Sequence, residues 1–218
     1  MVMNSLIIVG AVVLLAALLY FEKGENRKGL LPVKSALSFL FILAVIVQPH
    51  PMPTLYCLVL AGLLLCLGGD IFLALPQRRM FLYGLICFLL GHLLYILGFF
   101  YVAGTNQWTW IGLVTVFVIS LRVYVWLLPH LGAMKTPVLL YVIVITVMAC
   151  SAWSVLGGNH LALPGRIMVF VGALGFYLSD IFVARDRFIH KGFPNRLMGL
   201  PLYYTGQFIL AFSVGLLK

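Results

Sequence analysis

The sequence predicts an all-α integral membrane protein with eight transmembrane helices, arranged as two parallel four-helix repeats. Of its 218 residues, 64% are hydrophobic and 9% are charged, with a mean hydropathy of +1.15. A soluble domain of this size could not bury so much apolar surface. Apolar stretches of roughly 20 residues, the length that crosses a bilayer core, recur along the chain. Two similar phrases, each with one aspartate, indicate the duplication.

The first four apolar stretches are separated by turns rich in glycine, proline or asparagine, which mark where each helix ends. They are residues 5–21, 30–48, 55–75 and 80–103. The first stretch has no basic segment before it and no small-residue cleavage site. It is therefore expected to be a retained helix and not a signal peptide.

The last four stretches are residues 108–128, 136–156, 166–184 and 197–217. Spans exposed to lipid must satisfy their own backbone hydrogen bonds, so stretches of this length are helices and not strands. Pro32, Pro137 and Pro201 are expected in the first turns of their helices, where proline is tolerated. No predicted span has a proline near its centre.

The two acidic phrases lie in the third and seventh spans. They read Gly69-Asp70-Ile71-Phe72-Leu73-Ala74 and Ser179-Asp180-Ile181-Phe182-Val183-Ala184. Shorter matches pair the fourth span with the eighth and the second with the sixth. These matches predict one membrane domain, residues 1–218, with repeat halves at about 1–104 and 105–218, and parallel repeats of this kind occur in membrane proteins.

Basic residues gather in alternate loops. Those after the first, third, fifth and seventh spans carry ten: Lys23, Arg27, Lys28, Arg78, Arg79, Lys135, Arg185, Arg187, Lys191 and Arg196. The other side carries Arg166 and Lys218. The positive-inside rule therefore predicts that both termini face away from the cytoplasm. No retention or targeting tail is expected, and the bacterial inner membrane is favoured over the endoplasmic reticulum.

Four charged residues fall inside the spans at similar depth, about 6–9 Å from the cytoplasmic end at 1.5 Å per residue. They are Asp70, Asp180, Lys34 and Arg122. Tyr141 and Tyr203 or Tyr204 share this layer, and His92 and Gln207 lie deeper. Intramembrane charges are costly and by default mark functional sites.

This layer has two interpretations. The charges could form an interhelical ion-pair network that only holds the bundle together. Alternatively, they form a site for an amphiphile, with Lys34 and Arg122 holding an anionic headgroup and the two aspartates at the bond between head and tail. Two carboxylates close together in a low dielectric cannot both ionise easily. One would then serve as an acid and the other as a base.

Other classes of function are disfavoured. The net charge of +9 is spread over short loops and does not form a nucleic-acid-binding patch. The four cysteines lie in apolar stretches without CxxC spacing, as expected of small core residues. With His92 as the only histidine within a span, no metal site and no cofactor are expected.

Several motifs together resemble the lysoplasmalogenase family, the YhhN-like membrane hydrolases. They are Lys34, Gly69-Asp70, the run from Phe88 through Gly91-His92 to Tyr95, the run from Gly172 to Ser179-Asp180, and Tyr204-Thr205-Gly206-Gln207. The resemblance covers the second to eighth spans. The family often has proline directly after the lysine, where this chain has Ser35.

The resemblance implies hydrolysis of the sn-1 vinyl ether of a lysoplasmalogen to a fatty aldehyde and a glycerophospho-base. It implies no cofactor and no partner beyond the lysophospholipid and membrane lipid. We expect Asp70 as the acid and Asp180 as the base, or the reverse, with His92 orienting water. The expected substrate-binding residues are Lys34, Arg122, Tyr95, Tyr141, Ser179, Tyr204 and Gln207.

Two alternatives stay open. A lipid or small-metabolite transporter also uses parallel repeats and buried charges, although transporters tend to have helices broken at mid-membrane. A structural or accessory subunit would need loops that recruit a partner, and the longest expected loop has only about 12 residues, near the upper end of ordinary loop lengths. The sequence predicts neither the oligomeric state nor the preferred headgroup.

Overall fold

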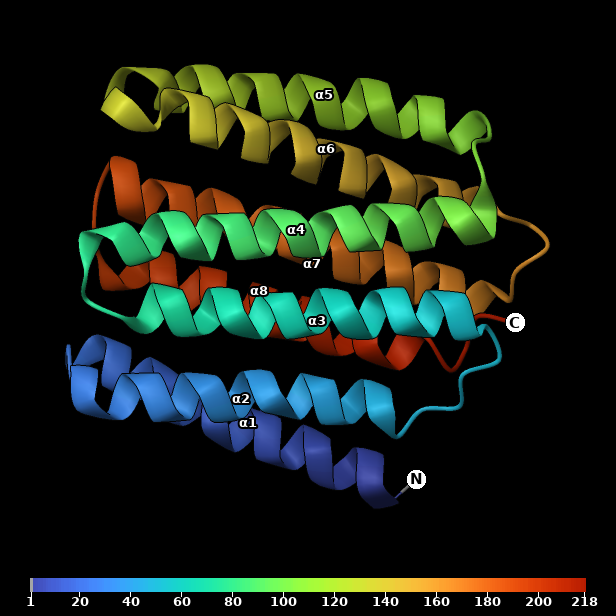
Figure 1. The fold of residues 1–218 in the computed structure, drawn as a ribbon, viewed down its shortest axis with the longest axis horizontal. Coiled ribbons are helices and arrows are strands. Elements are labelled where there is room, and N and C mark those ends of the chain that lie inside the picture. Colours follow the sequence, from blue (N-terminus) through green and yellow to red (C-terminus); the bar gives the residue numbers. More distant parts are fainter. Residues whose placement is uncertain (1) are drawn as a thin grey trace.

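The protein is a bundle of eight α-helices, described here from a computed structural model that covers residues 2–218 and contains no strand in that range (Figure 1). The helices are α1 (Val2–Lys23), α2 (Arg27–Ile46), α3 (Pro53–Ala74), α4 (Arg78–Ala103), α5 (Gln107–Leu127), α6 (Lys135–Gly157), α7 (Leu163–Phe188) and α8 (Phe193–Ser213). The all-α prediction is confirmed.

Seven of the helices in the described chain, α1 to α7, are long and apolar enough to cross a membrane. This fits a multi-pass membrane protein. The exception is α8, which is 21 residues long but carries several polar side chains. Those that are buried face the inside of the bundle and not the lipid: Asn195, Tyr203, Tyr204, Gln207 and Ser213.

Capping side chains, prolines and a glycine mark the ends of several helices. Asn106 caps α5 by accepting a hydrogen bond from the Trp108 amide, and Thr109 completes a capping box. α3, α7 and α8 each have a proline in the first turn. Proline is tolerated there because a backbone N–H at that position would have no acceptor within the helix. Gly104, with φ of 58°, ends α4.

Three predicted boundaries differ from the structure by four residues, and one of them is the end of α8, which lies at Ser213 and not at residue 217. α7 continues to Phe188, beyond the expected end at residue 184, and α8 begins at Phe193 instead of residue 197. The charged stretch from Arg185 resembles a loop, but its residues continue the helix past the apolar part. Asp180 is therefore eight residues from the end of α7, about 12 Å instead of about 6 Å.

The earlier start of α8 also corrects the prediction about proline. Pro201 is the ninth of 21 residues in α8, close to its centre. Proline has no N–H, so the carbonyl of Leu197 receives no backbone hydrogen bond from this position. Pro32 is likewise inside α2, whereas Pro137 is in the first turn of α6.

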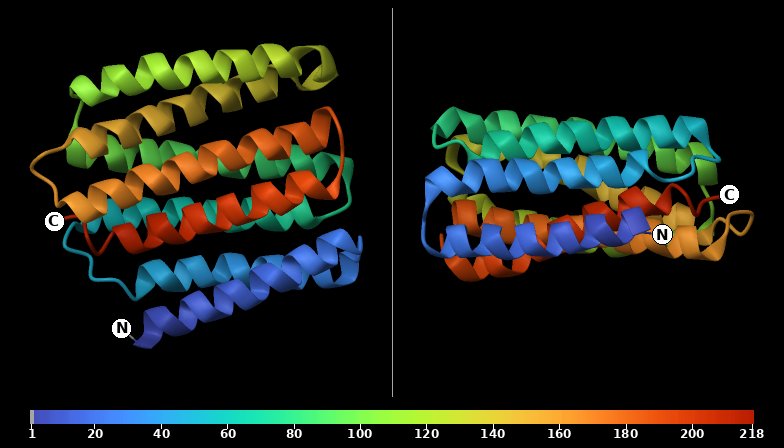
Figure 2. Two further views of the ribbon diagram at one scale, coloured as in Figure 1. Left: turned by 180° about the vertical axis from the view of Figure 1, so that it is seen from behind. Right: turned by 90° about the horizontal axis from the view of Figure 1, so that it is seen from below.

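The bundle places α2, α3 and α4 on one side and α1, α8 and α7 on the other, as the right-hand view of Figure 2 shows. Side-by-side contacts follow the order α1, α2, α3, α4, α6, α7 and α8, and α8 closes the bundle against both α1 and α2. α5 lies outside this arrangement and packs mainly on α6.

Glycines bring two helix pairs into close contact. A Cβ on Gly206 of α8 would lie 2.7 Å from the carbonyl oxygen of Gly172 on α7, and one on Gly91 of α4 would lie 3.1 Å from that of Gly62 on α3. Small residues allow helix backbones to approach in membranes. The close contacts are thus between α3 and α4 and between α7 and α8, and α3 and α7 are the helices that carry the intramembrane aspartates.

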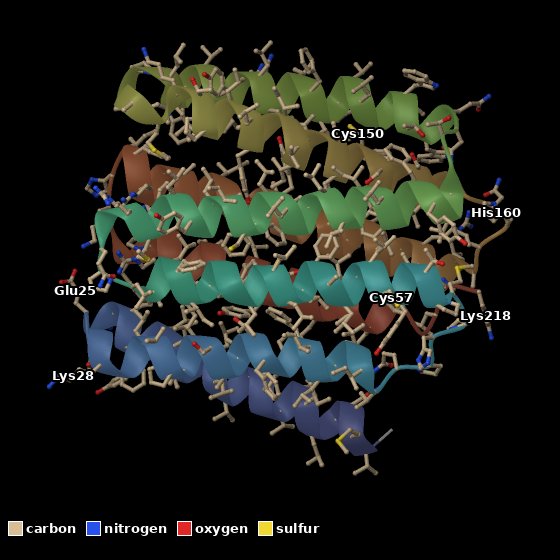
Figure 3. The ribbon with its side chains drawn as sticks, viewed as in Figure 1. Glu25, Lys28, Cys57, Cys150, His160 and Lys218 are labelled. Carbon is tan, nitrogen blue, oxygen red and sulfur yellow. The ribbon has the colours of Figure 1, made fainter. Side chains whose placement is uncertain are left out.

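The two ends of the bundle differ in charge. The loops α1–α2, α3–α4, α5–α6 and α7–α8 lie together at one end, named here the basic end, where Glu25 and Lys28 are labelled in Figure 3. His160 and Lys218 lie at the opposite end with both termini. The side chains of Arg27 and Arg78, counted among the basic loop residues above, are outside the described part of the structure.

Candidate active site

A cavity of about 500 Å³ opens near the basic end and reaches the intramembrane aspartates. Seven helices, α2 to α8, contribute to its walls, and its rim includes the end of α1 and the α1–α2 turn. All five acidic residues of the chain line it: Glu22, Glu25, Asp70, Asp180 and Asp186. A volume of this size is ordinary for a small-molecule site.

Asp70 is fully enclosed and surrounded by donors. Its Oδ1 lies 3.3 Å from the Lys34 ammonium of α2. Its Oδ2 accepts hydrogen bonds from the Ser38 hydroxyl at 2.6 Å and from the Tyr203 hydroxyl of α8 at 2.7 Å. An opposite charge and several donors favour the ionised form of a carboxyl group. Full burial of Asp70 opposes ionisation, but of the two intramembrane aspartates it is the one with a cation and several donors to stabilise the charged form.

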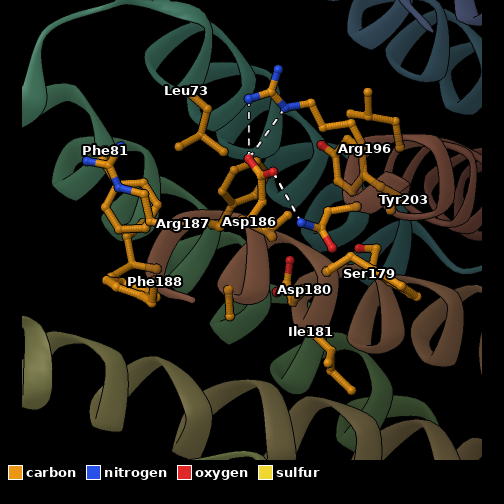
Figure 4. A pocket seen from close by; sticks show the side chains of 18 of the residues that line it. Leu73, Phe81, Ser179, Asp180, Ile181, Asp186, Arg187, Phe188, Arg196 and Tyr203 are labelled. Atoms are coloured by element: carbon orange, nitrogen blue, oxygen red, sulfur yellow. Dashed lines mark hydrogen bonds and ion pairs between the residues drawn. The ribbon is translucent and has the colours of Figure 1, made fainter. Parts of the chain in front are cut away.

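Asp180 has a different environment. Its Oδ2 accepts one hydrogen bond of 2.5 Å from the Tyr141 hydroxyl of α6, and no ion pair is formed with any side chain in the described part of the chain. Its other oxygen is free to face the cavity (Figure 4). With one donor and no cation beside it, Asp180 is the better placed of the two to carry a proton.

Arginines and carboxylates form the rim of the cavity. Arg196 contacts Glu22 of α1 at 2.8 Å and Asp186 of α7 at 3.4 Å, so its charge is already matched (Figure 4). Asp186 also accepts a hydrogen bond from the Gly192 amide at 2.8 Å. The Arg187 guanidinium lies 4.4 Å from the Phe81 ring centroid and pairs with no carboxylate among residues 2–218.

A chain of hydrogen bonds continues inward from Asp70. The Tyr203 hydroxyl accepts a bond from the Gln207 amide at 3.4 Å, and Gln207 in turn accepts one from Tyr95 at 3.2 Å. Tyr95 and Gln207 are fully buried and do not line the cavity. They were expected to touch a ligand as substrate-binding residues, but they reach the cavity only through the hydrogen bond to Tyr203.

His92 is fully buried behind the cavity wall. Its ring lies 4.4 Å from that of Phe176 and 5.5 Å from that of Tyr141, measured between centroids. Neither ring nitrogen has a hydrogen-bond partner within residues 2–218. Buried polar atoms are rarely left without a partner, so the environment of His92 is unusual.

Arg122 is not where the sequence analysis placed it. It is exposed on the outside of α5 and is not among the cavity-lining residues. Ser120, two positions earlier and therefore on nearly the opposite side of the helix, lines the cavity instead. Its hydroxyl lies 2.8 Å from that of Tyr177.

Four other predicted residues can be placed as well. Lys34, Tyr141 and Ser179 line the cavity, although the Ser179 hydroxyl donates to the backbone of its own helix. Tyr204 does not line it, and its hydroxyl lies 3.2 Å from that of Ser38.

Ser38 was not among the predicted site residues, and Tyr203 was predicted only as an alternative to Tyr204. Both contact Asp70 directly. The available signal was the spacing of Ser38 one helical turn after Lys34, which puts both side chains on one face of α2.

Within residues 2–218, no three histidine, cysteine, aspartate or glutamate side chains gather as ligands of a metal ion would. The polar groups of the cavity are carboxylates, hydroxyls, the Asn195 amide and cations from lysine and arginine. These groups can transfer protons, stabilise a cation and hold an anion.

The fold defines a polytopic helical membrane protein, with a cavity near one end of the bundle that Asp70 and Asp180 both line. The chain belongs to the YhhN family, whose sequence model matches residues 31–214. It is 30% identical over 174 residues to a lysoplasmalogenase of Mycobacterium bovis, covering 77% of this chain and 63% of that protein. It is 29% identical over 172 residues to lysoplasmalogenase TMEM86A of Bos taurus, covering 75% and 66%.

The predicted family resemblance is confirmed. The match to this chain spans less than two thirds of the length of these relatives. No solved structure is significantly similar to the chain.

Proposed function

We propose that this protein is a lysoplasmalogenase, which hydrolyses the sn-1 vinyl ether of a lysoplasmalogen by carboxylate acid–base catalysis. The observation that carries the proposal is that Asp70 and Asp180, from helices distant in sequence, line one cavity. The similarity to proteins named lysoplasmalogenase supports the substrate class.

Asp180 is the proposed acid. Vinyl ethers are opened by protonation of the β-carbon, which leaves an oxocarbenium ion on the ether side. Asp180 donates that proton, and the Asp70 carboxylate, kept charged by Lys34, stabilises the cation. Glycosidases stabilise the same kind of cation with two carboxyl groups. This assignment reverses the first of the two orders expected from the sequence, because Asp70 has the cation and the additional donors.

Water completes the reaction. A water molecule attacks the oxocarbenium carbon and passes a proton to Asp70, which gives a hemiacetal. As the hemiacetal collapses, protonated Asp70 returns this proton to the departing glycerol oxygen, and the Asp180 carboxylate takes the hydroxyl proton. Both carboxyl groups are then in their starting states, and one water has been consumed. We propose that the unpartnered nitrogens of His92 orient water near Tyr141.

The rim suits a phosphate-containing headgroup. Lys34 is committed to Asp70, and Arg196 to Glu22 and Asp186. Arg187 and Lys191 line the cavity without a carboxylate partner in the described chain. We therefore propose that they hold the phosphate, a role that the sequence analysis assigned to Lys34 and Arg122. Arginine is well suited to phosphate because its guanidinium can donate two parallel hydrogen bonds.

The test is direct. Purified protein is incubated with a lysoplasmalogen, and the released aldehyde is measured against a lysolipid with a saturated sn-1 ether, which lacks the carbon that accepts the proton. The proposal expects aldehyde from the vinyl ether alone. Folded protein that leaves the lysoplasmalogen intact would contradict it.

A transporter is the second candidate, and Pro201 favours it. A proline near the centre of α8 resembles the broken helices of transporters. Liposomes that contain the protein distinguish the two functions. A transporter moves intact lysoplasmalogen between leaflets, whereas a hydrolase converts it to aldehyde.

We also propose that all eight helices span the membrane, as one domain made of two repeats. The helix contacts support it, because α4–α6 and α8–α2 are matching pairs under the duplication and both occur. The spacing from Gly62 to Asp70 on α3 equals that from Gly172 to Asp180 on α7. A glycine of the following helix packs against each of these two glycines.

By the positive-inside rule, we propose that the basic end faces the cytoplasm and that both termini face away from it. The cavity would then open to the cytoplasmic leaflet, in which case substrate would come from that side. We favour the bacterial inner membrane over the endoplasmic reticulum. Labelling of single cysteines placed at each end of the bundle tests the orientation.

A further inference from the structure

An apolar groove runs between α4 and α6 beside the cavity. Its α4 side is formed by Leu82, Leu85, Ile86 and Leu89, and its α6 side by Thr136, Pro137 and Leu140. The α4 residues are spaced three or four positions apart, so they form one stripe along the helix. Thr136 is the only polar residue of the groove's described lining.

The groove is open to the surroundings of the bundle. Ile86 is 45% exposed and Leu140 is 54% exposed. Both residues lie within the first turns of helices that begin at the basic end. The groove is therefore in the same membrane leaflet as the cavity.

Leu85 connects the two hollows, because it lines both the groove and the cavity. The cavity wall beside it is also apolar and includes Phe81 and Phe88 of α4, and Val138 and Val142 of α6. A continuous apolar surface thus leads from the interior of the cavity, past Leu85, to the lipid.

The rim at the basic end is strongly charged. Glu22, Glu25, Asp186, Arg187 and Arg196 line it, beside a few apolar residues such as Leu75 and Phe188. A hydrocarbon chain gains nothing by lying among charged groups and water. A ligand with its headgroup at this rim therefore gains more by directing its chain along the apolar wall of the cavity.

We infer that the groove between α4 and α6 holds the hydrocarbon chain of the substrate, with Leu85 at the point where the chain passes from the cavity to the lipid. This inference rests on the proposed function and assigns a chain-binding subsite to the same site. The fatty aldehyde would leave sideways along the groove into the bilayer. The glycerophospho-base, which is water-soluble, would leave through the charged rim.

Photolabelling tests the subsite without requiring turnover. The probe is a lysophospholipid with a saturated sn-1 ether and a diazirine near the end of its chain, added to the full protein in detergent micelles. Unlabelled saturated-ether lysolipid is the competitor. We expect saturable labelling within residues 82–89 or 136–140, and non-saturable labelling of the lipid-facing surface of α1. Saturable labelling confined to other helices, or labelling of the groove that the competitor does not reduce, would overturn the inference.

Chain-length kinetics give a second readout. Ile86→Trp and Leu140→Trp place a large ring in the groove, and Leu97→Trp, at a 58% exposed position on α4 outside the groove, is the matched control. Loss of contact with two methylene groups lowers kcat/KM by about tenfold. We expect the decrease in the two groove variants to grow with substrate chain length, and Leu97→Trp to show no such trend.

An equal decrease for short and long chains, or none in either groove variant, would overturn the subsite. These outcomes differ from failure of the proposed function, in which the unmodified protein releases no aldehyde from any lysoplasmalogen.

Discussion

The Tyr203 hydroxyl of α8 donates a 2.7 Å hydrogen bond to Asp70 of α3. The carboxylate of the first half of the chain is thus oriented by a residue of the second half, whereas Asp180 is bonded by Tyr141 from its own half. Gln207 extends the Tyr203 contact inward to Tyr95. Asp70 is therefore held directly by side chains from two other helices, α2 and α8, and is linked through Tyr203 and Gln207 to α4.

Removal of the Tyr203 hydroxyl should lower activity more than removal of the Tyr204 hydroxyl. A hydrogen bond to a charged group contributes about 1.5–3 kcal/mol, so Tyr203→Phe should lower kcat by about 10- to 100-fold. Tyr204→Phe should have a smaller effect, because its hydroxyl contacts Ser38 and not the carboxylate. Aldehyde release by the two purified variants checks this. Equal losses in both would mean that the contact with Asp70 has no special role.

Headgroup binding should depend on the rim and not on α5. Arg187→Met and Lys191→Met should raise KM about 10-fold or more each while kcat changes little, because a charge-assisted phosphate contact is lost. Arg122→Met is the matched control, since Arg122 is exposed outside the cavity. Steady-state kinetics of the three variants decide the question. A KM effect limited to Arg122→Met would restore the role predicted from the sequence.

The site of protonation can be traced with isotopes. If Asp180 protonates the β-carbon, reaction in D₂O should give aldehyde with one deuterium on the carbon next to the carbonyl. Reaction in H₂¹⁸O should place ¹⁸O in the aldehyde and none in the glycerophospho-base. Mass spectrometry of both products at early times measures this. Label found in the glycerol oxygen would indicate a different bond cleavage.

Close helix contact predicts a graded response to added methyl groups. Gly206→Ala should destabilise the protein most, because its Cβ would lie 2.7 Å from a backbone oxygen. Gly91→Ala, with 3.1 Å to the equivalent oxygen, should cost less. Gly68→Ala, 3.7 Å from the Cys87 sulfur, should be tolerated. Thermal unfolding in detergent gives the order, and a Gly68→Ala variant less stable than Gly206→Ala would contradict it.

Much of the architecture could be predicted because lipid imposes simple rules. Span length and turn chemistry located all eight helices within a few residues, and the repeated aspartate phrase directed attention to Asp70 and Asp180. The end of α7 was missed because the end of an apolar run does not require the end of a helix. Residues such as Asp186 and Arg187 extend α7 past the apolar run.

Arg122 was wrongly predicted to be in the site because its depth along α5 was considered without the direction in which its side chain leaves the helix. Arg122 is at the expected depth, but its position around α5 was not considered. The buried positions of α5 include Gly112, Val116 and Ser120, four residues apart, and Arg122 falls on the other side. The hydroxyls that bond Asp70 could not be selected from sequence, because serine and tyrosine in apolar helices also serve packing and interfacial roles.

Variants of the Lys34–Asp70 ion pair can distinguish the structural role of these two charges from a catalytic role. Lys34→Met alone leaves a buried carboxylate without its cation, which should destabilise the protein by about 3–5 kcal/mol. The double variant Lys34→Met, Asp70→Asn removes both charges and should recover most of that stability. Thermal unfolding of the single and double variants tests this.

The most direct test of the carboxylate mechanism is to measure aldehyde release by two variants. One is the double variant Lys34→Met, Asp70→Asn, which should recover most of its stability, and the other is Asp180→Asn. We predict that both stay folded in detergent and release aldehyde from lysoplasmalogen at least about 100-fold more slowly than the unmodified protein, as expected when an acid–base group is lost. Undiminished release by either folded variant would contradict the account, because the pair of carboxyl groups would then be structural.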